Sequence, residues 1–188
     1  MDASYQSLRV RNAYPEDAAQ LCAWWNDGSV MAHAGFPHGL GTTEERIRSD
    51  LLTDTDLTRR RLIILYDGTP IGEMNYRLLH EEDSPRQAEI GIKICNPAFQ
   101  NRGLGRQALS LLIVHLFRDL HCARIVLDTN LHNLRAQHVY ESLGFERLGV
   151  RENCFQDQVG QWQSAVDYAL CPENFVSFLE EATAKEGI

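Results

Sequence analysis

The sequence lacks the features that mark several large classes of protein. No apolar run approaches the length of a membrane span, and the N-terminus has no apolar segment of the kind found in secretory signals. The five cysteines are widely spaced without a C-x-x-C pair, which is typical of reduced thiols in a cytosolic protein. The seven histidines form no H-E-x-x-H motif and no group with zinc-ligand spacing. We therefore expect a cytoplasmic protein with no membrane association and no metal.

Basic residues are also scarce, which bears on possible partners. Eighteen Lys and Arg stand against 26 Asp and Glu, for a net charge of −8. This balance argues against a general nucleic-acid binder, which needs a basic face, and it is compatible with cationic substrates. A hydrophobic content of 44% with 23% charged residues is typical of a globular protein, and the length of 188 residues favours one compact domain.

Hydrophobic periodicity and turn residues predict a mixed α/β chain. The 14–27 segment is expected to be a helix, with Pro15 in its first turn. Thr43 is placed to cap a second helix. The 29–41 segment between them has no hydrophobic periodicity and is expected to be a loop. Asp67-Gly68 predicts a hairpin within 61–80. The remaining expected strands are 7–13, 88–95, 123–130, 145–155 and 162–170, and the remaining expected helices are 104–120, 133–145 and 174–186.

The order of these elements predicts one parallel pair of strands. The 88–95 strand, the long helix after the glycines and the 123–130 strand form a β-α-β unit, for which a right-handed crossover is the rule. The 88–95 strand places Ala88, Ile90, Ile92 and Ile94 on one face, with Glu89 on the other. The fold class expected is therefore α/β (α+β) with a mixed sheet.

The glycines before the long helix predict an anion-binding turn. Gly103, Gly105 and Ala108 match G-x-G-x-x-A, but a dinucleotide-binding turn requires the strand to run directly into the first glycine, and here Asn96 to Arg102 intervene. No Gly-Lys-Ser/Thr follows, so a Walker A loop is also excluded. Glycines nonetheless let backbone N–H groups approach a ligand at a helix N-terminus, where phosphate is favoured. Arg102 and Arg106 add positive charge there.

Two motifs resemble those of the Gcn5-related N-acetyltransferases, the GNAT superfamily. Gln100 to Gly105 fits Q/R-x-x-G-x-G/A, and Asn133 to Phe145 fits N-x-x-A-x-x-x-Y-x-x-x-G-F at every marked position. The 31–45 segment and the G-x-W-x-x-x-V-D-Y pattern from Gly160 are most similar to the RimJ/RimL-like branch. The resemblance implies a GNAT domain over 7–171 followed by a C-terminal helix or tail over 172–188. It also implies a mixed central sheet of about six or seven strands with helices on both faces.

The resemblance further implies an acetyl-CoA site between the 88–95 and 123–130 strands. Backbone N–H groups of the glycine loop are expected to hold the pyrophosphate. The backbone of Lys93, Ile94 and Cys95 is expected to pair with the pantetheine arm. The side chain of Asn133 either contacts this arm or only caps its helix. The implied cofactor-binding residues are Lys93, Ile94, Cys95, Gln100, Asn101, Arg102, Gly103, Leu104, Gly105, Arg106 and Asn133.

Catalysis is expected from two residues that the same resemblance marks. Tyr140 corresponds to a tyrosine that protonates the departing thiolate, a transfer that a phenol in contact with sulfur can make. Glu89 lies eleven residues before Gln100, the offset of a catalytic glutamate in one branch; Glu73 and a water chain are the alternatives as general base. Cys95 has no identifiable partner base, which favours direct transfer over an acyl-enzyme.

The acceptor is expected to be a small-molecule amine or a peptide N-terminus. Polyamines and aminoglycosides are alternative acceptors, and a non-catalytic CoA-binding sensor or partner-binding module is an alternative function. A homodimer through the last hairpin is possible on this pattern. The residues expected along the acceptor groove are Trp24, Trp25, His33, Phe36, His38, Asn153, Gln156 and Trp162.

Overall fold

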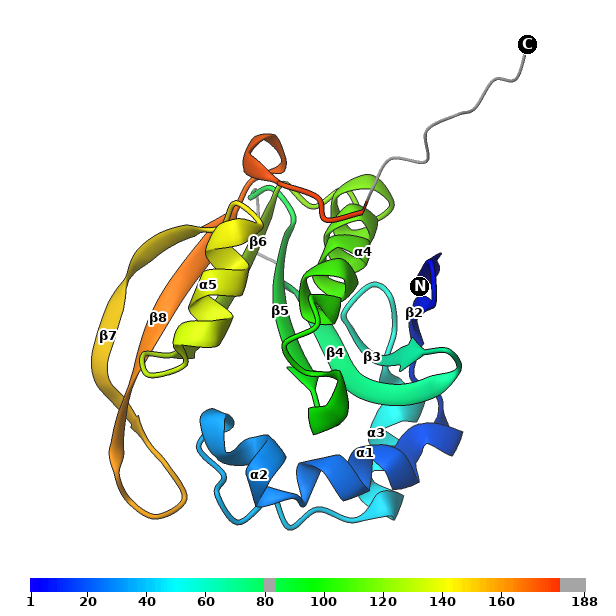
Figure 1. The fold of residues 1–188 in the computed structure, drawn as a ribbon, viewed down its shortest axis with the longest axis vertical. Coiled ribbons are helices and arrows are strands. Elements are labelled where there is room, and N and C mark those ends of the chain that lie inside the picture. Colours follow the sequence, from blue (N-terminus) through cyan, green and yellow to red (C-terminus); the bar gives the residue numbers. More distant parts are fainter. Residues whose placement is uncertain (80–83, 180–188) are drawn as a thin grey trace.

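A single mixed sheet forms the centre of the protein in a computed structural model, which describes residues 1–79 and 84–179 (Figure 1). Its strand order is β1-β2-β3-β4-β5-β6-β8-β7. The strands are β1 (Asp2–Tyr5), β2 (Leu8–Asn12), β3 (Arg59–Tyr66), β4 (Thr69–Leu79), β5 (Gln87–Ile94), β6 (Arg124–Asn130), β7 (Glu146–Gln156) and β8 (Trp162–Leu170).

The helices lie between these strands in the order that the sequence predicts. They are η1 (Pro15–Asp17), α1 (Ala18–Trp25), α2 (Gly28–Met31), η2 (Ala32–Ala34), α3 (Glu44–Thr53), η3 (Pro97–Phe99), α4 (Leu104–Arg118), α5 (Leu134–Ser142) and η4 (Pro172–Asn174). The expected caps are present: Thr43 Oγ1 accepts from Arg46 N at 3.3 Å and Asn133 Oδ1 accepts from Ala136 N at 3.2 Å. The expected mixed α/β fold is confirmed.

The parallel pair β5 and β6 separates soon after it forms. Its registered pairs run only from Gln87 opposite Arg124 to Glu89 opposite Val126. Beyond this point β5 stays with β4 as far as Ile94, and β6 stays with β8 as far as Asn130. The sheet therefore opens between β5 and β6, and α4 and α5 begin beside that opening (Figure 1).

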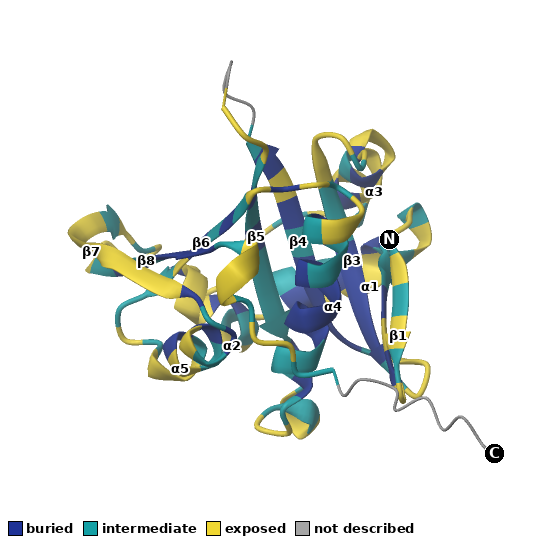
Figure 2. Ribbon diagram, turned by 90° about the horizontal axis from the view of Figure 1, so that it is seen from above, coloured by how far each residue is buried: buried dark blue, intermediate teal, exposed yellow. Residues whose placement is uncertain are grey.

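Both faces of the sheet are covered, as expected, but unequally. A large buried cluster joins Ile90 of β5 and Leu127 of β6 to α4 and α5. On the other face a smaller cluster joins Ile63 of β3 to α1 and α3. Burial is therefore deepest at β3, β4 and α4, whereas β7 is exposed at the edge (Figure 2).

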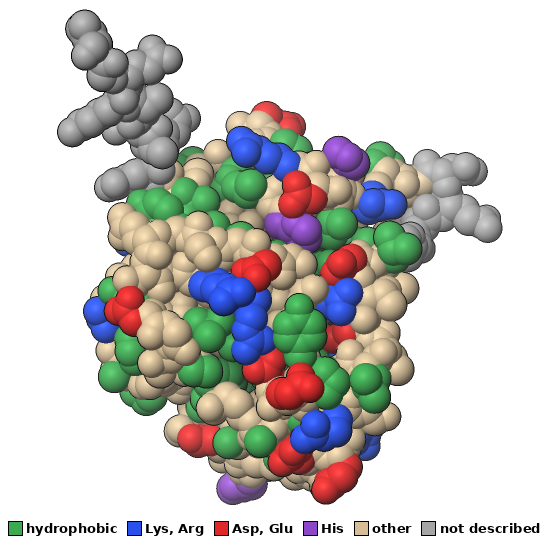
Figure 3. Space-filling model, turned by 90° about the vertical axis from the view of Figure 1, so that its right-hand side faces the viewer, with side chains coloured by type: hydrophobic (Ala, Val, Ile, Leu, Met, Phe, Trp, Pro, Cys, Tyr) green, Lys and Arg blue, Asp and Glu red, His purple; other side chains and the backbone are tan. Residues whose placement is uncertain are grey.

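The face that carries the N-terminal strands is covered by paired charges. Basic and acidic side chains lie next to one another there (Figure 3). Arg11 pairs with Asp17 at 2.7 Å, and Arg9 pairs with Asp2 at 2.6 Å. The Arg9–Asp2 pair is exposed and contributes little to stability, whereas the Arg11–Asp17 pair is partly buried. Charges of both signs are therefore mixed on this face.

Three local features differ from the sequence predictions. β1 was not predicted; it pairs with β2 around a tight turn at Gln6, whose φ is 52°. The segment expected as a loop contains α2 and η2, because Asp27 caps a short helical turn through Ser29 N at 2.8 Å. The prediction of a C-terminal helix is wrong for the residues up to 179, of which only η4 is helical. Pro172 begins this short turn, which ends at Phe175. The rest of the predicted helix lies outside the described residues.

Candidate active site

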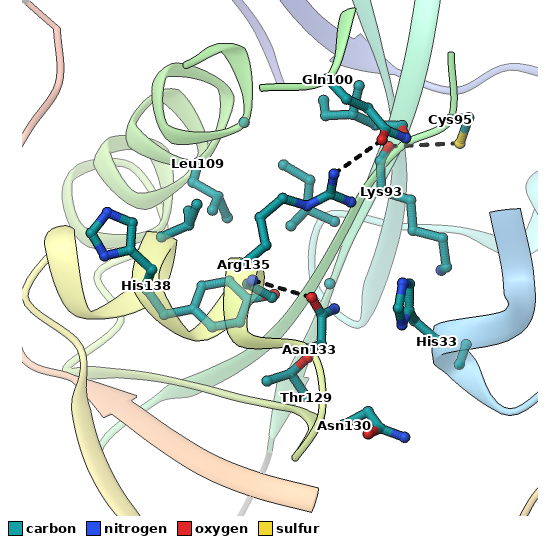
Figure 4. A pocket seen from close by; sticks show the side chains of 18 of the residues that line it. His33, Lys93, Cys95, Gln100, Leu109, Thr129, Asn130, Asn133, Arg135 and His138 are labelled. Carbon is teal, nitrogen blue, oxygen red and sulfur yellow. Dashed lines mark hydrogen bonds between the residues drawn. The ribbon is translucent and has the colours of Figure 1, made fainter. Parts of the chain in front are cut away.

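A pocket of about 1270 Å³ occupies the opening between β5 and β6. Its walls come from the glycine loop and α4 on one side, from β6 and α5 on the other, and from η2 across the entrance (Figure 4). All eleven residues expected to bind the cofactor line it, and so do Tyr140 and Glu89. The structure therefore brings the expected residues to one place, although their individual roles stay predictions.

The glycine loop presents a row of unpaired backbone donors. Gln100 N donates to Pro97 O and Arg106 N donates to Gly103 O, but in the part of the chain that the structure describes we find no acceptor for the N–H groups from Asn101 to Gly105. Asn101 and Gly103 both have positive φ, of 58° and 79°, which turns successive N–H groups toward one side. Such a nest at the start of a fifteen-residue helix suits a phosphate group.

Two arginines beside this nest are held by aromatic rings. The guanidinium of Arg102 lies 5.3 Å from the ring centroid of Tyr66 and 5.2 Å from that of Phe99, and that of Arg106 lies 4.5 Å from the ring of Phe178. Both arginines line the pocket. Cation–π contacts keep these charges in place without neutralising them, so they add to the attraction for an anion.

A hydrogen-bonded bridge crosses the pocket from α5 to the glycine loop. Arg135 Nη1 donates to Gln100 Oε1 at 3.0 Å, and Gln100 Nε2 donates in turn to the carbonyl oxygen of Ile94 at 2.9 Å (Figure 4). Ile94 ends β5, where backbone groups no longer have a neighbouring strand in β6. The side chain of Gln100 thus occupies an acceptor that an extended ligand could use.

Tyr140 lies at the inner end of the pocket, on α5. Its ring contacts Phe145 and Tyr168 at centroid distances of 5.9 Å each, which fixes its position. Burial raises the pKa of Tyr140 to about 12, and the charge of Asp128 and the ring of Tyr168 add to the effect. Among the described residues we find no hydrogen-bond partner for its hydroxyl. The phenol is therefore protonated near neutral pH and available as a donor.

A buried ion pair lies beneath the pocket, on the face of β5 opposite to α4. Glu73 is 2% exposed and accepts from Lys93 Nζ at 3.1 Å and from Trp25 Nε1 at 3.4 Å. The Glu73 carboxylate raises the pKa of Lys93, against the effect of burial, so Lys93 remains charged. Cys95, on the same face, has a pKa raised to about 12 by burial and by Glu73. Its thiol is therefore protonated and a poor nucleophile.

Glu89 lies at the closed end of the opening, where β5 and β6 still pair. Its carboxylate is bound by the guanidinium of Arg77, opposite it on β4. A second cavity of about 290 Å³ adjoins it and is lined also by Asp128, Asp167 and Arg151. Arg151 bridges both aspartates, with Nε 2.8 Å from Asp167 Oδ2. The carboxylates of Glu89, Asp128 and Asp167 therefore line this cavity, and the guanidinium groups of Arg77 and Arg151 are their partners.

The acceptor groove differs in part from the prediction. Of its expected residues His33 lines the main pocket, whereas Trp24 is buried against α3 and Trp25 contacts Glu73. Side chains that the sequence reasoning missed also line it, namely Ser29, Val30, Asn75, Thr129, Asn130, His132, Arg135, His138 and Phe155. Thr129 and Asn130 are the last two residues of β6, and polar residues at the carboxyl end of a buried strand are a signal that could have identified them.

Within residues 1–79 and 84–179 no group of three or more His, Cys, Asp or Glu side chains is placed to hold a metal ion. None of the helices in the described ranges is long and apolar enough to cross a membrane.

Comparison with known proteins identifies relatives of the whole domain. Residues 7–146 match the family model described as an acetyltransferase (GNAT) domain. The chain is 29% identical over 157 residues to aminoglycoside N(6′)-acetyltransferase type 1 of Klebsiella pneumoniae, covering 78% of this chain and 77% of that protein. It is 27% identical over 176 residues to spermidine N(1)-acetyltransferase of Escherichia coli K12, covering 93% and 91%.

A solved structure shares the fold at lower identity. RimL, a ribosomal L7/L12 α-N-protein acetyltransferase in complex with coenzyme A, superposes with a TM-score of 0.75 at 17% identity, over 90% of this chain and 96% of that one. The described fold is therefore one that occurs with CoA bound.

Proposed function

The chain belongs to the GNAT acetyltransferase family and is an N-acetyltransferase, and from that premise we propose that it transfers the acetyl group of acetyl-CoA directly to a primary amine on a small polycationic molecule. The observation that carries the proposal is the row of unpaired N–H groups from Asn101 to Gly105, which lies beside the side chains of Arg102 and Arg106 in the same pocket as Tyr140. This arrangement fits a pyrophosphate, with the thioester end of the molecule directed into the split sheet.

In the proposed reaction the amine nitrogen attacks the thioester carbon, the new C–N bond forms and the C–S bond breaks. Tyr140 donates its phenolic proton to the departing sulfur, and the proton lost by the nitrogen passes to Glu89, directly or through water. The products are the amide and CoA thiol. The hydroxyl of Tyr140 has no partner among the described residues and keeps its proton because burial raises its pKa to about 12, and both facts support its role as the proton donor.

Direct transfer is supported by the state of Cys95. Its thiol is 4% exposed and its pKa is about 12, so at neutral pH only a very small fraction is the nucleophilic thiolate. We expect Cys95→Ala to retain turnover. Loss of turnover in that variant, with CoA binding retained, would contradict direct transfer in favour of an acyl-enzyme.

A polycationic acceptor is supported by the charges around the cavity next to the pocket. Glu89, Asp128 and Asp167 face this region, and the net charge of the chain is −8. An acidic surface raises the local concentration of cations and gives ammonium groups charged hydrogen-bond acceptors. Polyamines and aminoglycosides carry several ammonium groups, and two relatives act on such compounds according to their names.

The proposal is tested by following CoA thiol release from acetyl-CoA with a panel of acceptors. The panel contains spermidine, kanamycin and a short peptide with a free N-terminus and no other amine. We expect release with at least one polycation and at least tenfold lower kcat/KM with the peptide. A preference for the peptide would contradict the acceptor class, and tight CoA binding without release for any amine would favour a non-catalytic CoA-binding module.

A further inference from the structure

The side chain of Lys93 is a fixed positive charge in the wall of the pocket. Lys93 lines the pocket, whereas its partner Glu73 is buried behind it, with exposed side-chain fractions of 29% and 3%. The two residues are direct neighbours across β4 and β5. In Figure 4 the Lys93 side chain extends from β5 toward His33 on η2, which is the side of the pocket away from α4.

Two hydrogen bonds and a close approach of two backbones hold this charge in place. Glu73 Oε1 accepts from Lys93 Nζ at 3.1 Å and from Trp25 Nε1 at 3.4 Å, so the carboxylate is anchored to α1. The backbones of β4 and β5 are closely packed here, because a Cβ on Gly72 would lie 2.2 Å from the carbonyl oxygen of Lys93. A lysine that is merely solvated has none of these restraints, so the position of Lys93 requires an explanation.

We propose that the Lys93 ammonium repels the protonated form of the acceptor amine, so that the nitrogen that reaches the thioester is neutral. An alkylammonium has no lone pair and cannot attack, and a like charge within about 6 Å favours its deprotonation. This first proton goes to solvent before transfer, and the second proton, which the nitrogen loses as the C–N bond forms, passes through water to Glu89. The overall balance is R–NH3⁺ plus acetyl-CoA giving R–NH–acetyl, CoA thiol and one proton, with Tyr140 supplying the thiol proton. This inference rests on the proposed function.

The arrangement also selects which amine of a polycation reacts. Lys93 and Glu89 lie on the same face of β5, four residues apart, or about 13 Å along the strand. Lys93 is therefore at one end of the acceptor region, and the carboxylates of Asp128 and Asp167, which line the second cavity beside Glu89, are toward the other end. A polycation bound with its distal ammonium groups on the carboxylates presents its remaining amine, in the neutral form, to the thioester.

Other charged or titratable groups surround Lys93 and do not remove its charge. Glu73 on β4 balances it from behind, and the thiol of Cys95 on β5 is protonated near neutral pH. Asp27, which also raises the pKa of Cys95, lies near the same cluster, and His33 on η2, Asp128 on β6 and Tyr140 on α5 line the same pocket. The Glu73 carboxylate keeps the pKa of Lys93 above its usual value, so the ammonium is the predominant form near neutral pH.

The test is the pH dependence of kcat/KM in variants of the ion pair. The acceptor is spermidine or kanamycin, whichever the wild type acetylates faster. Lys93→Met removes the charge, and we expect kcat/KM to fall about tenfold at pH 7 but only about threefold at pH 10, where an alkylamine with a pKa of ~10.4 is already about a quarter neutral without assistance. The tenfold loss corresponds to a rise of about one unit in the pKa of the bound amine.

Two further variants distinguish the effect of losing the charge from the effect of damaging the fold. Glu73→Gln/Lys93→Met leaves no uncompensated buried carboxylate and is expected to show the same dependence on pH, whereas Lys93→Arg keeps the cation and should retain the wild-type ratio between the two pH values. CoA affinity and thermal unfolding of each variant report on the integrity of the site and the fold.

An equal loss at both pH values in the two Lys93→Met variants, or no loss at pH 7, would overturn the inference. Either result requires that the wild type transfers acetyl groups, so it is distinct from failure of the proposed function, in which the wild type releases no thiol with any amine at either pH.

Discussion

Arg135 and Gln100 join the two walls of the pocket, with Arg135 Nη1 3.0 Å from Gln100 Oε1. The same Gln100 side chain donates to the carbonyl oxygen of Ile94 at 2.9 Å. If the pantetheine arm pairs with the end of β5, it competes with Gln100 for that carbonyl. The bridge is therefore an arrangement of the free protein that CoA must open.

Gln100→Ala removes the competing amide and leaves the backbone N–H groups of the loop in place. We expect CoA to bind about fivefold more tightly, because one hydrogen bond worth about 1 kcal/mol no longer has to be broken. Isothermal titration calorimetry measures the change. Adenosine 3′,5′-bisphosphate, which lacks the pantetheine arm, is the control ligand and should bind both proteins equally; weaker binding of CoA to the variant would show that the Gln100 side chain contacts CoA favourably.

Tyr140→Phe removes the proposed acid without changing the shape of the ring. We expect kcat to fall about 10²-fold, within the usual range for loss of a positioned proton donor, with CoA affinity within about twofold of the wild type. The pKa of Tyr140, about 12, lies above its usual value, so the phenol keeps its proton as the pH rises to 10. The wild-type kcat should accordingly show no fall up to pH 10, and thiol release in the variant within threefold of the wild type would exclude the role.

Glu89→Gln tests the proposed acceptor of the amine proton. The expected result is a loss of at least tenfold in kcat/KM at pH 7, because the amide cannot take up a proton. Arg77→Met is the matched control, since it removes the ion pair and leaves the carboxylate; its kcat/KM should stay within about threefold of the wild type. Unchanged activity in Glu89→Gln would mean that the proton leaves through water alone.

Gly103→Ala and Gly105→Ala make the same chemical change on either side of Leu104, with opposite expected effects on stability. Gly103 has a φ of 79°, where a Cβ costs about 1–2 kcal/mol. Gly105 lies in α4, and a Cβ there would be an ordinary 3.9 Å from Ile94, so alanine should stabilise the helix by about 0.5–1 kcal/mol. Thermal unfolding should show a lower Tm for the first variant and a higher Tm for the second. The same direction of change in both would contradict the assigned backbone strain.

Local patterns in the sequence predicted most elements of the fold correctly. The hairpin at Asp67-Gly68 forms, with φ values of 47° and 76°, and Asn133 caps α5. These features depend on residues close in the chain, through turn geometry and helix capping. The predicted C-terminal helix failed as far as 179, because an apolar spacing near Phe175 and Phe178 reflects packing of an irregular segment against the core.

The sequence by itself determined the order of the strands and helices, the glycine turn before α4 and the motif that contains Tyr140, because each depends on short-range propensity, spacing or a contiguous pattern. The tertiary structure alone decided which charges meet. Glu73 faces Lys93, and Glu89 faces Arg77, through the register between β4 and β5. That register follows from the packing of both sheet faces against separate sets of helices, and no local pattern encodes it. The positive charge in the pocket wall and the free row of N–H groups are therefore properties of the folded sheet.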